Sequence, residues 1–531
     1  MTDRQPREPV PARLDALADE ICAELAERFP VCLASDEFHF FPHYRPARRD
    51  WSRWDDFSDA GIQACLADIS RWQGRIARLT PPKPSPVEAA DLDLLTRVLA
   101  TLDEQLRYVQ PHKTQPTFHL TIISIGLADA LEDSRDAFRR RAGTLSGFLD
   151  AARDNLCRIS ACYRDIALEM LPGLRTWAVG LDLSDGDRRR IDAAFDRFGD
   201  HLGRVPTASD FRLDGDLYER IVDRHLGCRM GLGELARRLD REIEATADQL
   251  SASARRIDPA KPWLSVFESM PPPAPTDHDA VSIYQAGIDR LRQHSLEAGF
   301  LTPDAMAGCD VAVQIIPRHL RPVRADAAYT MPAGHPPKGG VFFVLAHDRQ
   351  ILPRDMLLLA AHETYPGHHL LDTRRWGHKR PLRRYVEFPL FYEGWASFAE
   401  EILFDTGFFS GPANRLLSAR RRFWRAHRGR ADLNIHSGRW CLEEAALALS
   451  ATGLVNRDKA MAMVRRYALK PGYQLSYTIG RQKFRRIYMD YLGSGRKPAQ
   501  FVRNAVSHGE IGFDHLAERL LGCRSPQGNR E

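Results

Sequence analysis

The sequence predicts a mainly α-helical protein with a small β-sheet, and three patterns carry this prediction. Apolar residues recur at three- and four-residue steps through most of the first half, short β-type runs occur between 310 and 349, and proline clusters separate the helical stretches. The chain has 531 residues. Because a typical domain has roughly 150 residues, this length allows either one large fold or two domains.

In the first half, apolar residues recur regularly at helical spacing and form apolar stripes. In the segment 87–109 the apolar residues with this spacing are Leu92, Leu95, Val98, Leu99, Leu102 and Leu106. Similar stripes run over 12–28, 59–79, 143–172, 186–203 and 230–256. This spacing places the apolar side chains on one face, so each stripe predicts an amphipathic helix packed against a core.

Two proline clusters interrupt the pattern, the first at 81–86 and the heavier one at 271–275. Proline cannot donate a backbone hydrogen bond and does not continue a helix, so a dense cluster is typical of a linker. We therefore expect a helical N-terminal half at 1–270 and a second half at 271–531.

The second half begins with the expected sheet. The runs VAVQIIP at 311–317 and GGVFFVLAH at 339–347 predict strands, and helices resume near 353. Pro353 suits the first turn of a helix, and Asp355 brings the negative charge that a helix N-terminus favours. This helix is expected to continue through apolar residues to His362.

Composition excludes several classes of protein. Hydrophobic residues make up 44% and charged residues 27%, as in ordinary globular proteins. The net charge of +5 comes from 75 basic and 70 acidic residues that are mixed along the chain, so nucleic-acid binding is not indicated. Short basic clusters such as Arg420–Arg422 are interpreted as solvated helix faces.

Cysteine usage and hydropathy bear on localisation. The nine cysteines form no C-x-x-C pair or regular framework, which favours a reducing compartment. The first 25 residues contain no apolar segment typical of a secretion signal, and no later run reaches the roughly 18 apolar residues of a membrane span. Cytoplasmic residence without membrane association is therefore expected.

One octet carries the chemistry: His362-Glu363-Thr364-Tyr365-Pro366-Gly367-His368-His369. Catalytic zinc typically has three nitrogen, sulfur or oxygen ligands from the protein and one open position. In the motif H-E-x-x-H two histidines one helical turn apart bind the metal, and the glutamate acts as general base. The octet supplies the same residue types, but Pro366 stands where that motif has its second histidine.

The spacing within the octet excludes a regular helix as the ligand-bearing element. Six or seven helical steps would separate His362 from His368 or His369 by about 9–10 Å along the axis, too far for one ion. Pro366 and Gly367 are expected to interrupt the helix and to loop out a turn. Either His368 or His369 could then lie opposite His362.

A second acidic element follows at 391–401, with the sequence FYEGWASFAEE. A third ligand from a neighbouring helix is expected in this class of site, and Glu393 is the best candidate. Glu400 lies seven residues later on the same helical face. It is expected to orient a ligating histidine.

These motifs resemble the bacterial family called domain of unknown function 885, whose signatures are H-E-x-x-P-G-H-H and E-G-W-A followed by an acidic residue. The stretches 430–436 and 471–480 also resemble its C-terminal pattern, so the resemblance covers most of 280–500. The family is similar to gluzincin metallopeptidases. The resemblance therefore implies a mostly helical, metallopeptidase-like fold with a deep cleft, which the N-terminal half would line.

The resemblance also implies residue roles. His362, Glu393 and either His368 or His369 would bind one zinc ion, with Glu363 as general base. His368 is favoured because its Gly-His pair resembles the end of shorter gluzincin motifs, which would leave His369 in a supporting or substrate-facing role. Further candidates near the reacting carbonyl are Tyr477, as an oxyanion donor, and more weakly Tyr473 and His436.

Two further expectations follow from this comparison. The family often has a tyrosine where this chain has Phe398, so a missing hydroxyl there was a candidate for altered substrate contacts. The run at 339–347 could form a sheet edge that pairs with an extended peptide substrate.

The function predicted from the sequence is zinc-dependent hydrolysis of a peptide or amide bond. One alternative is an amide hydrolase acting on a small-molecule intermediate of specialised metabolism. A carboxylate-bridged di-iron site is disfavoured because paired E-x-x-H motifs do not occur in the motif region. The remaining alternative is a metal-free helical binding protein. No sequence feature identifies the substrate or the oligomeric state.

Overall fold

The computed structural model describes residues 9–271, 279–306, 309–317, 327–345 and 353–522. The chain forms two compact units. The first contains Met1–Leu213, Pro317–Ala325 and Arg380–Tyr385, and the second contains Asp214–Ile316, Asp326–Lys379 and Val386–Glu531. The expected linker at 271–275 lies, beyond Pro271, outside the described residues, and the division into halves at 270 stays a prediction.

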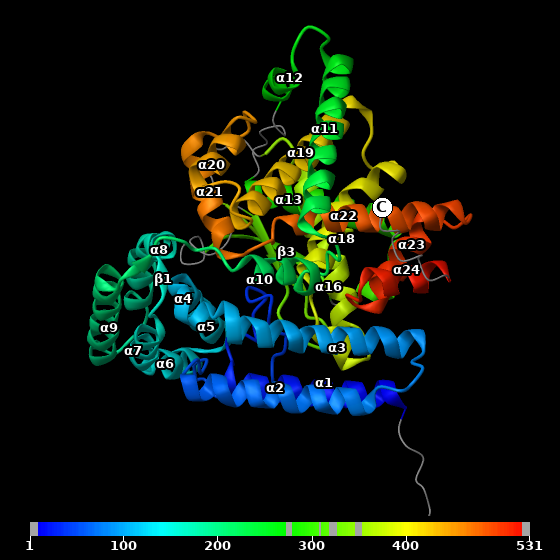
Figure 1. Ribbon diagram of the computed structural model, residues 1–531. Helices are drawn as coiled ribbons and strands as arrows, with labels where there is room; N and C mark the ends of the chain where they lie inside the picture. The colour runs from blue at the N-terminus through cyan, green and yellow to red at the C-terminus, as the bar shows by residue number, and fades with distance from the viewer. Residues whose placement is uncertain (1–8, 272–278, 307–308, 318–326, 346–352, 523–531) are drawn as a thin grey trace, which may run out of the picture. The chain divides into compact units, whose positions relative to one another are not determined.

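The first unit is built from helices, with α1, α2 and α3 packed side by side (Figure 1). A two-stranded parallel pair, β1 and β2, completes it. Its elements are α1 (Val10–Arg28), α2 (Asp59–Leu79), α3 (Pro86–Glu104), η1 (Gln105–Val109), α4 (Pro111–Thr114), α5 (Pro116–Asp133), α6 (Arg135–Gly143), α7 (Leu145–Asn155), β1 (Ile159–Ser160), α8 (Ala161–Val179), α9 (Asp185–Arg204), β2 (Thr207–Ala208) and α17 (Pro381–Tyr385).

The second unit holds the octet and both downstream motifs. Its elements are α10 (Gly215–Arg220), η2 (Ile221–His225), α11 (Leu232–Ile257), α12 (Trp263–Ser269), α13 (Ala280–Glu297), α14 (Pro303–Met306), β3 (Val311–Ile315), β4 (Ala327–Thr330), β5 (Gly340–Val344), α15 (Met356–Glu363), α16 (His368–Trp376), α18 (Pro389–Asp405), α19 (Gly411–His436), α20 (Leu442–Ser450), α21 (Arg457–Leu469), α22 (Leu475–Gly493), α23 (Pro498–Ala505), η4 (Val506–His508) and α24 (Phe513–Leu521). The expected mainly α-helical fold with a small sheet is confirmed.

The predicted helical stripes correspond to α1, α2, α3, α9 and α11 with small differences at their ends. The stripe at 143–172 is the exception. It was expected to be one helix, but α7 ends at Asn155 and α8 begins at Ala161, with β1 between them. Apolar spacing alone did not reveal this break, because both helices bury their apolar residues with the same period.

The sheet of the second unit has the strand order β3-β5-β4. β5 pairs in parallel with β3 and antiparallel with β4. The expectation that the run at 339–347 forms an edge was therefore wrong: β5, which covers Gly340–Val344 of this run, is the central strand. Since both sides of its backbone are already paired, it cannot accept a peptide substrate as an added strand.

Two pairs of long helices form the frame around the octet: α11 packs along α19, and α18 packs along α22. The second pair comes unusually close at Gly394 and Gly480. A Cβ atom at Gly394 would approach the Gly480 backbone to 2.6 Å, and one at Gly480 would overlap the carbonyl oxygen of Leu390. This crossing sets Glu393, one residue before Gly394, beside the first turn of α22.

We expect Gly480→Ala to destabilise the protein, because the added methyl group has no space between two backbones. The loss should be about 1–3 kcal/mol or more, as for other overpacked sites, and is measured as a lower denaturant midpoint. Gly493→Ala on the same helix is the matched control, since its Cβ would meet nothing within 4 Å. Equal midpoints for the two variants would contradict the close crossing.

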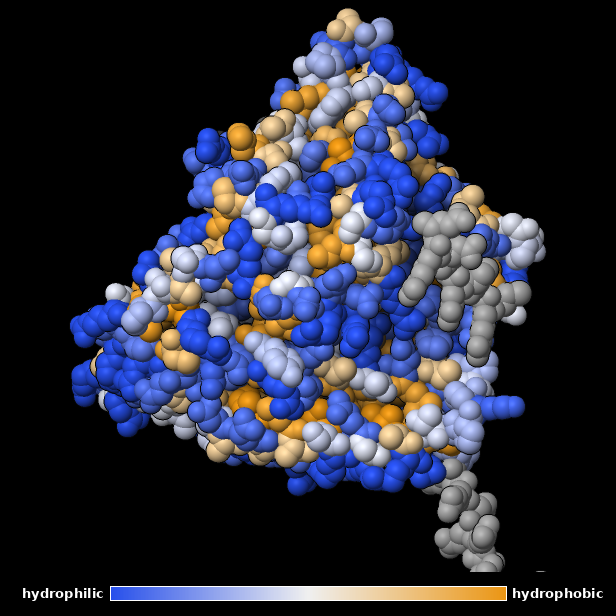
Figure 2. Space-filling model, in the orientation of Figure 1, coloured by the Kyte–Doolittle hydropathy of each residue, from blue (hydrophilic) through white to orange (hydrophobic). Residues whose placement is uncertain are grey.

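Hydrophilic residues cover most of the face shown in Figure 2, with hydrophobic patches between them. Among the described residues, no helix is both long and apolar enough to cross a membrane.

Candidate metal centre

The octet spans two helices and the turn between them. α15 ends at Glu363 and α16 begins at His368. The Gly367 N–H donates to the Ala361 carbonyl (3.1 Å), and the Trp395 indole donates to the Pro366 carbonyl (3.0 Å). Any Cβ at Gly367 would overlap the carbonyl oxygen of His362, so this close return of the chain requires glycine. The predicted interruption of the helix is confirmed.

This turn brings His362 and His368 together and faces them with Glu393 from α18. Glu393 Oε2 lies 3.3 Å from Nε2 of His362 and 3.5 Å from Nε2 of His368, and the two imidazole rings are 4.8 Å apart. Metal bonds of 2.0–2.1 Å at tetrahedral angles would separate ligand atoms by about 3.3 Å. The observed spacing therefore fits one divalent ion.

Burial supports the same interpretation of these three side chains. His362, His368 and Glu393 are all buried, and Glu393 Oε2 accepts no hydrogen bond of good geometry. Although burial raises the pKa of Glu393, the two histidines hold that pKa well below its usual range. An ionised carboxylate oxygen that is buried without a hydrogen bond is energetically costly, and this one faces two imidazoles. A metal ion bound between the three side chains would satisfy it. His362, His368 and Glu393 are the group that could hold a metal ion among the described residues.

The second oxygen of Glu393 is held by two tyrosines. Tyr473 and Tyr477 each donate a hydroxyl hydrogen bond to Oε1, at 2.7 and 2.8 Å. Their donation to one oxygen turns the other towards the histidines. Tyr477, expected to bind an oxyanion, thus already has an acceptor, although its ring is partly exposed and lies 6.3 Å from the His362 ring.

The other ring nitrogen of His362 is oriented by Glu400. Nδ1 lies 3.0 Å from Glu400 Oε1 and 3.1 Å from Nη2 of Arg425. Arg425 also donates to that carboxylate oxygen at 2.6 Å, and in the tautomer with its proton on Nδ1, His362 would donate to Glu400. The lone pair on Nε2 then faces Glu393 and His368, as metal binding requires.

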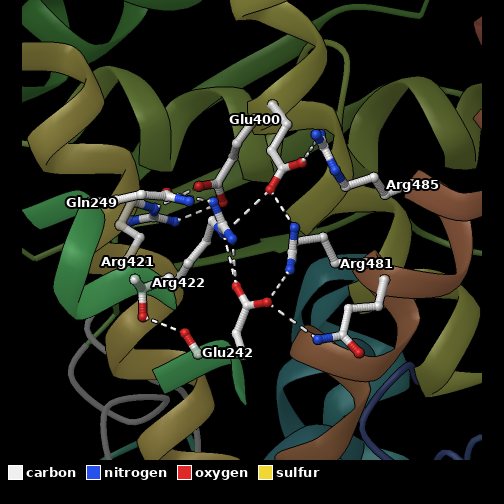
Figure 3. Close-up of polar contacts among 10 residues, drawn as sticks. Glu242, Gln249, Glu400, Arg421, Arg422, Arg481 and Arg485 are labelled. Atoms are coloured by element: carbon white, nitrogen blue, oxygen red, sulfur yellow. Dashed lines mark hydrogen bonds and ion pairs between the residues drawn. The ribbon is translucent and has the colours of Figure 1, made fainter. Parts of the chain in front are cut away.

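Arginines of α19 hold Glu400 in turn (Figure 3). Arg421 donates to both of its oxygens (2.8 and 3.0 Å) and to Asp355 (3.1 Å). Burial raises the pKa of Glu400, but Arg421 and Arg425 lower it well below the usual range. The interpretation of Arg420–Arg422 as a solvated face was wrong for Arg421, whose side chain is 12% exposed, because the periodicity of charge cannot reveal carboxylates on a neighbouring helix.

A second group of ion pairs lies beside the first (Figure 3). Arg481 bridges Glu242 (2.6 Å) and Glu401 (2.5 Å), while Arg422 binds Glu242 (2.9 Å) and Arg485 binds Glu401 (3.1 Å). Glu401 is therefore occupied by guanidinium groups, as Glu400 is. Neither is free to supply ligands to a second metal, which disfavours the di-iron alternative.

His368 is packed against Tyr392, a residue that the sequence analysis did not single out. The two rings stack with their centroids 3.9 Å apart, and the Tyr392 hydroxyl donates to Asp372 (3.1 Å). Arg375 pairs with the other Asp372 oxygen (2.7 Å). Tyr392 directly precedes Glu393. Its position next to a predicted metal ligand could have identified it as a residue of the site from the sequence.

The His369 side chain points away from His362, His368 and Glu393. Its Nε2 lies 3.0 Å from the Cys309 carbonyl and its Nδ1 lies 3.0 Å from the Tyr329 hydroxyl of β4. Burial lowers the pKa of His369 to about 4, so the ring is neutral. Nε2 then donates to Cys309 while Nδ1 accepts from Tyr329, and no nitrogen remains for a metal.

Glu363 is the partly exposed carboxylate beside the buried ligands. Desolvation raises its pKa to about 7, with His368 acting in the opposite direction and Glu393 adding to the rise. No hydrogen bond or ion pair to another described residue engages its carboxylate. It is therefore free to interact with water or a substrate.

Two further expected positions lie elsewhere. The contacts of His436 include the Tyr467 carbonyl (3.1 Å) and the Tyr218 ring, and it is not part of the group that could hold a metal ion. Phe398 is buried against Phe484 and other aromatic rings. A hydroxyl there would face the core, so the expected effect on substrate contacts was wrong.

The fold and this site define a class: a mainly α-helical protein whose buried His362–His368–Glu393 group could hold a metal ion. The chain belongs to the family described as "Bacterial protein of unknown function (DUF885)", whose model matches residues 45–520. No curated protein matches the chain at a significant level.

Solved structures share the fold. One from Colwellia psychrerythraea has a TM-score of 0.78 at 15% identity and covers 97% of this chain and 99% of its own. One from Shewanella oneidensis has a TM-score of 0.71 at 15% identity and covers 96% and 99%. A Pyrococcus furiosus carboxypeptidase, at 11% identity over 98% and 97% of the two chains, reaches a TM-score of only 0.42, too low to indicate the same fold.

The names of the first two structures correct one expectation. Each is called a "putative lipoprotein", which contradicts the expectation of cytoplasmic residence. That expectation rested partly on the scattered cysteines. Disulfides are needed mainly by small domains without a sufficient core, so the free cysteines among the described residues of this large helical fold carry no information about the compartment.

Proposed function

We propose that this protein is a zinc-dependent hydrolase of peptide or amide bonds. The observation that carries the proposal is the convergence of His362, His368 and Glu393 at the spacing of a coordination tetrahedron, with Glu363 free beside them. Two histidines and one glutamate are the ligand set of many catalytic zinc sites. This geometry supports the zinc-ligand set that the resemblance implied, with His368 as the second histidine.

When bound, the zinc ion would act as a Lewis acid for the scissile carbonyl and for water. Glu363 accepts the proton of the attacking water and later passes it to the leaving nitrogen. Glu400 keeps His362 in the tautomer that presents Nε2, and Tyr473 holds Glu393 with Oε2 forward. The Tyr477 hydroxyl, which binds Glu393 Oε1, could turn from Glu393 to a developing oxyanion.

The substrate is proposed to be a peptide, with a small amide as the alternative. A metal-free binding protein is disfavoured, because it would leave Glu393 Oε2 buried without a hydrogen-bond partner among the described residues. Such burial costs about 1–3 kcal/mol per group. A bound ion would remove that cost at Glu393.

Metal removal tests the proposal. Protein purified without chelator should contain close to one zinc per chain and should hydrolyse members of a panel of peptides and N-acyl amino acids. A chelator should abolish hydrolysis and lower the unfolding midpoint, and added zinc should restore both, because an ion that binds the folded state stabilises it. Less than about 0.2 zinc per chain would contradict the proposal.

A further inference from the structure

Arg428 is a half-buried arginine of α19 that lies near the His362–His368–Glu393 group. Its guanidinium lies over the Tyr477 ring, 4.8 Å from the centroid, and its Nε donates to the Gln474 side chain at 2.9 Å. The Tyr477 hydroxyl in turn binds Glu393 at 2.8 Å. One aromatic ring therefore separates this cation from a proposed metal ligand.

Arg428 differs from the neighbouring arginines on its helix in having no carboxylate partner. Arg425 and Arg421, one and two turns earlier on nearly the same face, both form ion pairs with Glu400. No carboxylate among the described residues forms an ion pair with Arg428. Cations removed from water are normally paired, so an arginine without an ion pair beside a candidate active site points to an anionic ligand.

The nearby carboxylates are held by other groups. Asp432, one turn further along α19, accepts the backbone N–H groups of Gly472 (2.9 Å) and Gln474 (2.8 Å). Both oxygens of Glu393 face other groups, Oε1 two tyrosine hydroxyls and Oε2 the two histidines. Glu400 is held by Arg421, Arg425 and His362. A divalent ion at the histidines would add further positive charge, so the site as a whole would favour a negative substrate group.

We propose that Arg428 binds the free carboxylate of the substrate. A guanidinium matches a carboxylate in a planar, two-point hydrogen-bonding geometry. This inference rests on the proposed function and specifies its substrate class: a peptide cleaved near its free C-terminus, or an N-acyl amino acid, rather than an internal peptide bond. Gln474 and Tyr477 position the guanidinium, and its charge provides the selectivity.

The test compares acids with their uncharged amides. The probes are a panel of N-acetyl amino acids and short peptides, each with a free carboxylate or as the C-terminal amide. The zinc-loaded enzyme should hydrolyse the acids with a kcat/KM at least about a hundredfold above that for the amides, since a site built for a polar group rejects its absence strongly. Arg428→Gln should lower kcat/KM for the acids about a hundredfold, mainly through KM, and leave the amides within about threefold.

Two further variants separate the possible outcomes. Arg415→Gln, an exposed arginine of the same helix, should behave as the parent, and Arg428→Lys should recover part of the preference for acids. Equal hydrolysis of acids and amides by the parent, or equal losses for both in Arg428→Gln, would overturn the inference.

Calorimetry of the panel acids with the parent and Arg428→Gln gives a readout without turnover. If the parent hydrolyses nothing but binds the acids through Arg428, the proposed function fails and the carboxylate site stands. If the parent neither hydrolyses nor binds the acids, the proposed function and the carboxylate site both fail.

Discussion

Glu363→Gln should retain the metal and lose hydrolysis. The amide is nearly isosteric with the carboxylate and lies outside the His362–His368–Glu393 group, so metal content should stay equal to that of the parent. Without a group that accepts the proton of water, turnover should fall by about 10²–10⁴-fold, the usual contribution of a general base. Metal analysis and hydrolysis rates on the same preparation measure both effects.

The control for this variant is Glu443→Gln, which removes the charge of an exposed glutamate on α20. Its activity and metal content should match those of the parent. Activity of Glu363→Gln within tenfold of the parent would defeat the assignment of Glu363. Loss of metal in the same variant would instead make Glu363 part of the binding site.

His368→Ala and His369→Ala should have opposite effects although the two residues are adjacent. His368→Ala removes one of three ligands, and metal content should fall below about 0.2 per chain because two ligands hold zinc weakly. His369→Ala should keep the metal. It should lower the unfolding midpoint, because the Tyr329 hydroxyl and the Cys309 carbonyl lose their partner, at about 1–3 kcal/mol for each buried group left unpaired.

Both variants should be assayed for metal content and for unfolding in the metal-free form, which separates ligand loss from a general loss of stability. Retention of metal by His368→Ala together with its loss from His369→Ala would show that the ligand had been chosen wrongly. Loss from both would indicate that His369 supports the turn at Gly367 more strongly than its contacts suggest.

Much of the candidate site could be predicted because its signals are local in sequence. His362, Glu363, Pro366 and Gly367 lie within one short segment, where residue type and backbone chemistry together indicate an interrupted helix. Glu400 was expected to orient a histidine because it lies two helical turns from Glu393, and the structure sets it against His362. These inferences needed only helical periodicity and the ligand preferences of zinc.

Other features could not be predicted, because they depend on helices that are distant in the sequence. The cited partners of Arg421 and Arg425 are Asp355, which directly precedes α15, and Glu400 on α18. β5 could be recognised as central only from the strands on either side of it. Tyr477 was expected at the reacting carbonyl. Its hydrogen bond to Glu393 could not be predicted, because it depends on the glycine crossing that brings the backbones of α18 and α22 into contact.

The sequence by itself determined that the protein is mainly helical, that the helix carrying His362 breaks at Pro366 and Gly367, and that the octet supplies metal-ligand types. The tertiary structure alone decided that His368 rather than His369 faces His362. The physical reason is hydrogen-bond saturation: both nitrogens of His369 are used by Tyr329 and Cys309, groups that lie 40 and 60 residues away along the chain. No pattern within the octet specifies those partners.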